Sequence, residues 1–471
     1  MKKTRFSILC ALMLILTVTF SAVLTGCDAL SDIPDVSADL TPTEELVIYI
    51  PPDGGTMLRP AIQWFREAYP DIQVTVSDFD REERMSYTSR VNMELMAGTG
   101  PDVIFPHSLD ADQHKLMDAG MFLNLTGIME EDEDFNRGDY FEPVLDGGIY
   151  RGRQYVVPYG YNLHAYYLAD AEKLREIGFD PSQAADATSF LAETARTLPE
   201  AAKNAAFQNM FSRGPVLYRL FAASGLELID WEKKTALPDK DGFRAFCEAY
   251  KPYYSDENTE PSLSYESPID GRPVYLYGTG DIPSDIAAGS YIFWDNRELP
   301  SVAPFSSLKA YCEPVSFVPQ RADGGVQAWS SHTAAVRASS KNQRNAYEFI
   351  KFLLSGQMQD TSPKLDGGRF GWFPVRNESR IMHFDYDGSR LEGPDFWLTY
   401  DQRSVEGWRA GLSEEEMGAI QELTVSADAC SAFGEIGLDW VRDMLPYFKD
   451  ERSLDDCIKD LEFKLLLYLE E

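Results

Sequence analysis

Basic residues are few in this chain. Its 471 residues include 43 lysines and arginines against 76 aspartates and glutamates, which gives a net charge of −33. A protein that binds nucleic acid needs a basic face to neutralise phosphates. The composition therefore predicts no nucleic-acid partner, and the only basic cluster, Lys2, Lys3 and Arg5, lies at the amino end.

Cysteine and histidine are also scarce, with six and five residues. The cysteines form no CxxC pair, and the histidines do not recur at the spacing of metal ligands, so we expect neither a zinc site nor a cofactor. The cysteines beyond the amino-terminal segment are Cys247, Cys312, Cys430 and Cys457. In an exported protein these four are compatible with disulfides or with buried thiols.

Sequence motifs of common enzyme classes are missing as well. The chain contains no GxSxG, HExxH, Walker A or dinucleotide-binding fingerprint. A secreted glycosidase uses a pair of carboxylates, but among 76 acidic residues some pair always exists, so composition gives no support for one. We expect a protein that is not an enzyme.

The chain does have the composition of an ordered protein, with 44% hydrophobic and 13% aromatic residues. Its length exceeds the roughly 250–300 residues at which a single core stops growing. At least two lobes are therefore predicted.

Residues 1–26 have the order of a secretory signal: basic residues, an apolar run from Phe6 to Val23, and then Leu24-Thr-Gly-Cys27. The quartet resembles the lipobox of bacterial lipoproteins, which implies cleavage before Cys27 and a diacylglyceryl group on its thiol. An uncleaved anchor is the alternative, because the apolar run is long enough to be considered as a membrane span. Residues 27–44, with several Asp and Pro, are predicted to be a flexible tether.

Strand and helix patterns alternate along the next part of the chain. The predicted strands are 46–50, 72–76 and 98–105, and helical spacing of apolar residues covers 58–69, 82–97 and 111–119. Gly120 is expected to be the left-handed cap of the last of these helices. Strands that alternate with helices indicate βαβ units on a parallel sheet.

Short motifs follow one another in the order and spacing of a known family. The early ones are Phe65-Arg-Glu-Ala-Tyr-Pro-Asp-Ile72, Ala97-Gly-Thr-Gly-Pro-Asp-Val103, Ala119-Gly-Met-Phe-Leu-Asn-Leu-Thr126 and Tyr150-Arg-Gly-Arg-Gln-Tyr-Val-Val-Pro158. The late ones are 346–354, 370–375 and the closing segment from Ser453. Together they resemble the bacterial extracellular solute-binding proteins of family 1, the maltose-binding type.

The resemblance implies an α/β, two-lobed periplasmic-binding-protein-like fold of type II, with three crossings between the lobes and a ligand cleft. The crossings are expected near 158–162, 330–333 and 378–383. The expected divisions are 1–26 signal peptide, 27–44 tether, 45–160 plus 334–380 amino-terminal lobe, and 161–333 plus 381–471 carboxy-terminal lobe.

Ligands of open α/β sheets lie beyond the carboxyl ends of the strands, so we seek binding residues in the loops that follow them. Asp53 follows the first strand and would accept hydrogen bonds from ligand hydroxyls, although Pro-Asp-Gly also forms ordinary turns. His107 and Ser108 follow the third strand at a position that the family uses for ligand; a capping or surface role is the alternative for His107. Tyr161 and Asn162 lie where the family's first crossing begins and would face the cleft.

Aromatic side chains matter because a sugar site needs flat apolar faces and a few polar groups. Trp294, beside Asp295, follows a segment similar to the family's Gly-x-x-Ala-Met strand, after which a ligand-stacking aromatic often comes; a core tryptophan is the alternative. Trp329 precedes the expected second crossing, and Trp372 precedes the late Pro-Val turn. We predict ligand contacts from all four, whereas Trp64 shares a helix with other apolar residues and is expected to be packing.

The expected function is that of a lipid-anchored extracytoplasmic receptor of an ABC importer, a monomer that closes on its solute and delivers it to a membrane permease. A carbohydrate, in particular an oligosaccharide, is the expected ligand. A peptide, a polyamine or another polar solute is the alternative, with a glycosidase or a sensory lipoprotein as more distant ones.

The lipobox-like quartet generates the first testable prediction. Cys27→Ser removes the thiol that would carry the lipid, and because two acyl chains hold a protein on a membrane far better than one or none, the variant should leave the membrane fraction. Mass spectrometry of the native amino terminus measures the modification directly. An unmodified Cys27 with residues 1–26 still attached would contradict the prediction.

Overall fold

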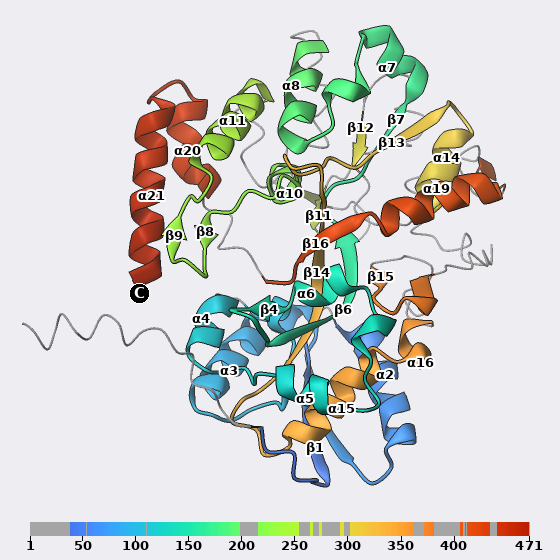
Figure 1. The fold of residues 1–471 in the computed structure, drawn as a ribbon, viewed down its shortest axis with the longest axis vertical. Helices are drawn as coiled ribbons and strands as arrows, with labels where there is room; N and C mark the ends of the chain where they lie inside the picture. The colour runs from blue at the N-terminus through green and yellow to red at the C-terminus, as the bar shows by residue number, and fades with distance from the viewer. Residues whose placement is uncertain are drawn as a thin grey trace, which may run out of the picture.

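The computed structural model describes residues 38–52, 54–109, 111–197, 215–253, 264–266, 273–275, 293–295, 302–360, 372–380, 406–407, 410, 412–433 and 440–470. They form two lobes, with the amino-terminal lobe at the bottom of Figure 1 and the carboxy-terminal lobe at the top. Two long strands, β6 (Val156–Leu163) and β14 (Val326–Val336), run between the lobes.

The amino-terminal lobe is built on a mixed sheet with seven described strands in the order β15-β6-β14-β3-β1-β2, with β16 also paired to β14. The further strands are β1 (Glu45–Ile50), β2 (Gln73–Asp78), β3 (Val103–Ile104), β15 (Phe373–Pro374) and β16 (Ala427–Ser431). Strand β1 pairs in parallel with β2 and β3, whereas β14 is antiparallel to β3 and β6. The parallel pairing confirms the βαβ units that the alternating pattern predicted.

Helices cover both faces of this sheet. They are α2 (Gly55–Ala68), α3 (Arg84–Met96), α4 (Gln113–Asp118), α5 (Thr126–Glu131), α6 (Glu142–Asp146), α15 (Gln343–Leu353) and α16 (Gly356–Gln359). Successive side chains of a strand point to opposite faces, so Leu46, Ile48 and Ile50 of β1 join one core with α2 and α15, while Tyr49 joins a second core with α3 and α4. Trp64 packs against the first core, as expected.

A buried carboxylate ties the Gly-Thr-Gly-Pro-Asp motif to the rest of this lobe. Asp102 accepts hydrogen bonds from the backbone of Val47 (2.7 Å) and from the side chains of Arg337 (3.1 Å), Ser340 (2.6 Å) and Asn342 (2.9 Å). These partners belong to β1 and to the segment between β14 and α15. The Asp102 side chain therefore holds the start of β3 both to β1 and to the segment that follows β14.

The first described residues also attach to α15. The backbone N–H of Asp39 donates to Gln343 (2.6 Å), and the Asn345 amide donates to the carbonyls of Thr43 (3.0 Å) and Glu45 (2.9 Å). The chain therefore enters the amino-terminal lobe along this helix.

The carboxy-terminal lobe has a three-stranded sheet, β12-β7-β13, among its described residues. Its elements are β7 (Tyr167–Asp170), α7 (Ala171–Ile177), α8 (Ala187–Thr197), α10 (Pro215–Ala223), β8 (Ile229–Asp230), β9 (Thr235–Ala236), α11 (Lys240–Tyr250), β12 (Phe293–Asp295), α14 (Val302–Lys309), β13 (Pro314–Phe317), α19 (Glu414–Thr424), α20 (Trp440–Phe448) and α21 (Leu454–Glu470). Aromatic rings fill its core: Phe190 lies 4.9 Å from Phe293, and Phe221 lies 4.8 Å from Trp440. This core is a distinct cluster of buried residues, whereas Leu168 of β7 and Leu308 of α14 belong to the first core described above.

Several local predictions agree with the structure. Gly120 has the left-handed φ of 68° that a helix cap requires. The closing family motif also has a structural reason at its first residue, because the Ser453 hydroxyl accepts a hydrogen bond from the backbone N–H of Asp456 (3.2 Å) at the start of α21. Strand β3 is shorter than expected, with only Val103 and Ile104 in the ladder. The expected lobe boundaries at 160/161 and 333/334 fall inside β6 and β14, and residues 381–383 of the third expected crossing lie outside the described residues.

The four cysteines left open by the sequence, Cys247, Cys312, Cys430 and Cys457, are free thiols in the structure, and the first and last of them are buried. Burial raises the pKa of the Cys312 thiol to about 12. Within the described ranges, no helix combines the length and the apolar character needed to cross a membrane.

The Asp102 network generates a stability prediction. Asp102→Ala leaves the Arg337 guanidinium, whose side chain is 9% exposed, as an uncompensated buried charge, so unfolding should become about 3–5 kcal/mol easier. Asp78→Ala is the matched control, because it removes a carboxylate from the exposed ion pair with Arg59 and should cost about 0–1 kcal/mol. Urea unfolding measures both, and equal losses would contradict the role given to Asp102.

Candidate functional site

Two predicted site residues meet where β14 passes the end of β3. His107 lies in a short turn of helix, Pro106–Ser108, directly after β3, and Trp329 lies on β14. Their ring centroids are 5.9 Å apart. The His107 side chain is exposed, whereas Ser108 and Trp329 are half-buried.

A second histidine stacks on Trp329 from the end of β6. His164 directly follows that strand, and its backbone N–H donates to the carbonyl of Gln327 on β14 (3.3 Å). Its ring lies 6.0 Å from the Trp329 ring, with 26° between the planes. The Nε2 atom of His164 is buried and has no hydrogen-bond partner within the described part of the chain. It is therefore a polar atom that a ligand could satisfy.

A third histidine lies on the next irregular part of β14. His332 is 5.2 Å from the ring of Trp372 and 5.8 Å from that of Tyr159, and its Nδ1 is 3.2 Å from the Ser331 hydroxyl. Trp372 is buried, with 6% of its surface exposed. We call His107, His164, Trp329, His332 and Trp372 the ring cluster.

A glycine makes room for the tryptophan at the edge of this cluster. A Cβ atom on Gly160 would lie 2.3 Å from Cε3 of Trp372, so only glycine lets the indole approach the β6 backbone this closely. Gly160 also pairs with His332 across the two strands. Its carbonyl accepts from the buried Ser330 hydroxyl (2.6 Å).

Two imidazoles of the ring cluster, those of His164 and His332, are held in their neutral form. Burial lowers the pKa of His164 and of His332 to about 3, with added repulsion from Arg219 and His107 respectively. The pKa of His107 is lowered as well, first by the protein that surrounds the ring and second by the positive charge of Arg84. The His107 side chain nevertheless reaches solvent. A neutral imidazole offers one hydrogen-bond donor and one acceptor. The cluster therefore combines flat rings with uncharged polar groups.

Of the remaining predicted residues, Tyr161 and Asn162 are buried on β6, and nothing is described of the side chains of the others. Tyr161 is fully buried between Phe141 and Phe373, so its ligand role stays a prediction that this position does not support. Asn162 is 4% exposed and pairs with Trp329 through the backbone. Asp53 lies outside the described residues, and for Trp294 and Asp295 the structure describes only the backbone of β12, which pairs with β7.

Sequence reasoning missed His164 and His332. Apart from His107, which follows a predicted strand, the histidines were considered only for the spacing of metal ligands. In the described ranges no group of His, Cys, Asp and Glu is arranged to hold a metal ion. Their positions in the sequence could have identified them as candidates. His164 comes two residues after Asn162, and His332 falls inside the expected second crossing.

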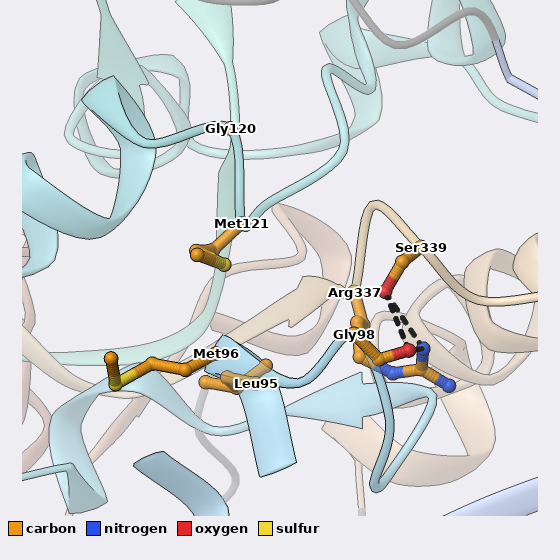
Figure 2. A pocket seen from close by; sticks show the side chains of 7 residues that line it. All are labelled: Leu95, Met96, Gly98, Gly120, Met121, Arg337 and Ser339. Atoms are coloured by element: carbon orange, nitrogen blue, oxygen red, sulfur yellow. Dashed lines mark hydrogen bonds between the residues drawn. The ribbon is translucent and has the colours of Figure 1, made fainter. Parts of the chain in front are cut away.

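A separate cavity of about 180 Å³ opens on the amino-terminal lobe. It is lined by Leu95, Met96, Gly98, Gly120, Met121, Arg337 and Ser339 (Figure 2). The five N–H groups of its arginine donate to the carbonyls of Gly98, Gly100 and Pro101, to Ser339 and to Asp102. No donor of that guanidinium is left for an anion, so we assign the cavity no binding role.

Two α/β lobes joined by paired strands, with rings gathered on those strands, define a two-lobed ligand-binding protein. Residues 61–378 match the family described as bacterial extracellular solute-binding protein, and the chain belongs to that family. The resemblance stated from the motifs is thereby confirmed. No curated protein sequence matches the chain.

Solved structures show the same fold. The sugar-binding protein MalE of Xanthomonas citri is 13% identical, with a TM-score of 0.56, over 90% of this chain and 97% of that one. The cyclic alpha-maltosyl-1,6-maltose binding protein of Arthrobacter globiformis is 14% identical, with a TM-score of 0.55, over 91% and 99%. A putative oligosaccharide periplasmic-binding protein of Synechococcus sp. MITs9220 is 14% identical, with a TM-score of 0.53, over 91% and 99%. At these identities the likeness confirms the two-lobed type II fold and nothing finer.

The lowered histidine pKa values generate a pH prediction. Between the unfolded pKa of about 6.5 and the folded value of about 3, the unfolded chain binds protons at His164 and His332 that the folded chain does not. Their contribution to stability is therefore lost as the pH falls through this window.

The double variant His164→Gln, His332→Gln should lose less stability than the natural chain on acidification. The difference has an upper limit of about 1.4 kcal/mol per pH unit for each histidine. Urea unfolding at pH 7, 6 and 5 measures it. Parallel pH profiles for the two proteins would show that these imidazoles are not held neutral by the fold.

Proposed function

We propose that the protein is the extracytoplasmic solute receptor of an ABC importer and that its ligand is a carbohydrate, in particular an oligosaccharide. The observation that carries the ligand class is the ring cluster, in which the half-buried Trp329 lies between His107 and His164. Indole faces suit the C–H surfaces of sugars, and a few polar groups fix the hydroxyls. The Nε2 atom of His164, which has no hydrogen-bond partner among the residues that the structure describes, is one such group.

The charge of the ring cluster, considered without the predicted Asp53 and Asp295, favours this ligand class over a cationic one. A polyamine or a cationic peptide needs carboxylates, whereas the ring cluster contributes imidazoles whose low pKa values keep them neutral at physiological pH. An uncharged ligand rich in hydroxyls fits these groups better. Two of the solved structures with this fold are, by their descriptions, proteins that bind a sugar and a cyclic maltosyl-maltose, and they support the same class.

The proposed mechanism is closure of the lobes around the solute. Strands β6 and β14 connect the lobes, and their register shifts on both sides of His332, so the ladder is weakest where bending would occur. Ligand contacts made only in the closed arrangement would shift the population toward it. The closed form would then present its solute to a membrane permease. The family consists of binding proteins, which supports a receptor over a glycosidase.

The proposed site also includes predicted residues that are not members of the ring cluster. Asp53, Trp294 and Asp295 remain part of it as predictions from their places after strands, and Ser108 from its place beside His107. The proposed location is the outer face of the cell membrane, with Cys27 as the lipid-modified residue, export by residues 1–26, and a monomer as the working form.

The ligand proposal predicts a specific loss at Trp329. Trp329→Ala removes the central face of the ring cluster and should weaken sugar binding by about 1–3 kcal/mol. The ligand is first identified by thermal shift over sugars, peptides and polyamines, since a ligand at 100 times its Kd stabilises by about 2.7 kcal/mol. Titration calorimetry then compares the variants.

Trp64→Ala is the matched control, because Trp64 lies on α2 and packs on the amino-terminal core rather than in the ring cluster. This change should alter stability with little change in affinity. Stabilisation by polyamines or peptides alone would overturn the carbohydrate class. Consumption of the sugar, seen by chromatography of the same sample, would overturn the receptor in favour of an enzyme.

A further inference from the structure

A second contact joins the two lobes away from β6 and β14. The hairpin formed by β8 and β9 and the carboxyl end of α21, both in the carboxy-terminal lobe, reach α4 of the amino-terminal lobe (Figure 1). At its centre the ring of Trp231 stacks on that of His114, with centroids 4.5 Å apart and 9° between the planes. Trp231 packs against a core of each lobe.

Ion pairs surround this stack. The Asp118 carboxylate at the end of α4 accepts a hydrogen bond from the Lys234 ammonium of the hairpin (2.5 Å) and another from the Tyr150 hydroxyl (3.0 Å). Arg151 of the amino-terminal lobe lies 3.4 Å from the same carboxylate. One carboxylate of α4 is therefore shared between cations of the two lobes.

The backbone at both cations is strained. Lys234 has a φ of 52° and Arg151 a φ of 49°, in the left-handed region that residues with a Cβ rarely adopt. Such conformations persist only when the surrounding contacts fix them, and they concentrate at sites that switch or bind. Here both strained residues direct their charge to Asp118.

The last helix adds a third connection. The Tyr468 hydroxyl on α21 donates to Asp112 at the start of α4 (2.6 Å), and the Lys115 ammonium lies 3.6 Å over the Tyr468 ring. The hairpin and α21 thus hold one short helix from the opposite lobe. Rotation of the lobes about β6 and β14 at this edge would have to break these contacts.

We propose that this contact, formed by Trp231, Lys234 and Tyr468 on His114, Asp118 and Asp112, is an interlobe latch that sets the resting angle between the lobes in the ligand-free protein. Its members are suited to reversible opening, because the Lys234 and Asp118 side chains remain 37% and 27% exposed. The latch goes beyond the proposed function: it concerns the free protein and does not depend on which solute binds.

The test measures the distance between the lobes without ligand. Spin labels introduced as non-canonical residues at Ala119 and Phe463 report from the exposed end of α4 and from the exposed face of α21, and they leave the native cysteines untouched. In pulsed dipolar spectroscopy, the full chain carrying Trp231→Ala with Lys234→Ala should show a longer mean distance and a broader distribution than the unmutated chain.

A matched control lies in the same hairpin. Lys233 pairs with Asp230 inside the hairpin at 2.7 Å and its side chain is 77% exposed, so Lys233→Ala removes an equal charge without touching α4 and should leave the distance unchanged. Asp118→Asn, which leaves the hairpin sequence intact, should lengthen the distance in the same direction. An unchanged distance in both latch variants, with circular dichroism showing folded protein, would overturn the latch and leave the proposed function standing.

Discussion

The two halves of strand β14 pair with different strands, and the placement of the lobes depends on this strand. Ala335 and Val336 pair with β3 inside the amino-terminal sheet, whereas Ala328 and Trp329 pair with β16, and β6 lies along both halves. In a regular strand Trp329 and His332 would point to opposite faces, because they are three residues apart. The register shifts between them break this alternation. His107 is near enough to contact the ring of Trp329 and to lower the pKa of His332.

The amino-terminal half of the fold could be predicted because its signals are local. Apolar residues at strand and helix spacing in 46–97 gave β1, α2, β2 and α3 within a few residues, and the cap at Gly120 followed from a single glycine. The family motif around Asp102 also has a physical reason in the structure: it places a carboxylate that closes a network with residues more than 230 positions away. The motif was visible in the sequence, but its partners were not.

The site could be predicted only in part, and burial explains the difference. All eight residues of β6 are buried, so the alternation that normally shows which side of a strand meets solvent is absent. The sequence of β6 therefore does not show which way Tyr161 faces. His107 and Trp329 were predicted from their positions after a strand and before a crossing, and the structure brings these two rings together. His164 and His332, and the latch on α4, depend on contacts between segments far apart in the chain, such as Tyr468 with Asp112, which no local pattern records.

The hydrogen bonds that fasten residues 39–45 to α15 have a mechanical consequence. A restraint applied to the chain ahead of these residues is carried through Gln343 and Asn345 into the sheet of the amino-terminal lobe. Under such a restraint the amino-terminal lobe would be the fixed half of the molecule. The carboxy-terminal lobe, connected to it through β6, β14 and the α4 contact among the described residues, would be the half free to move.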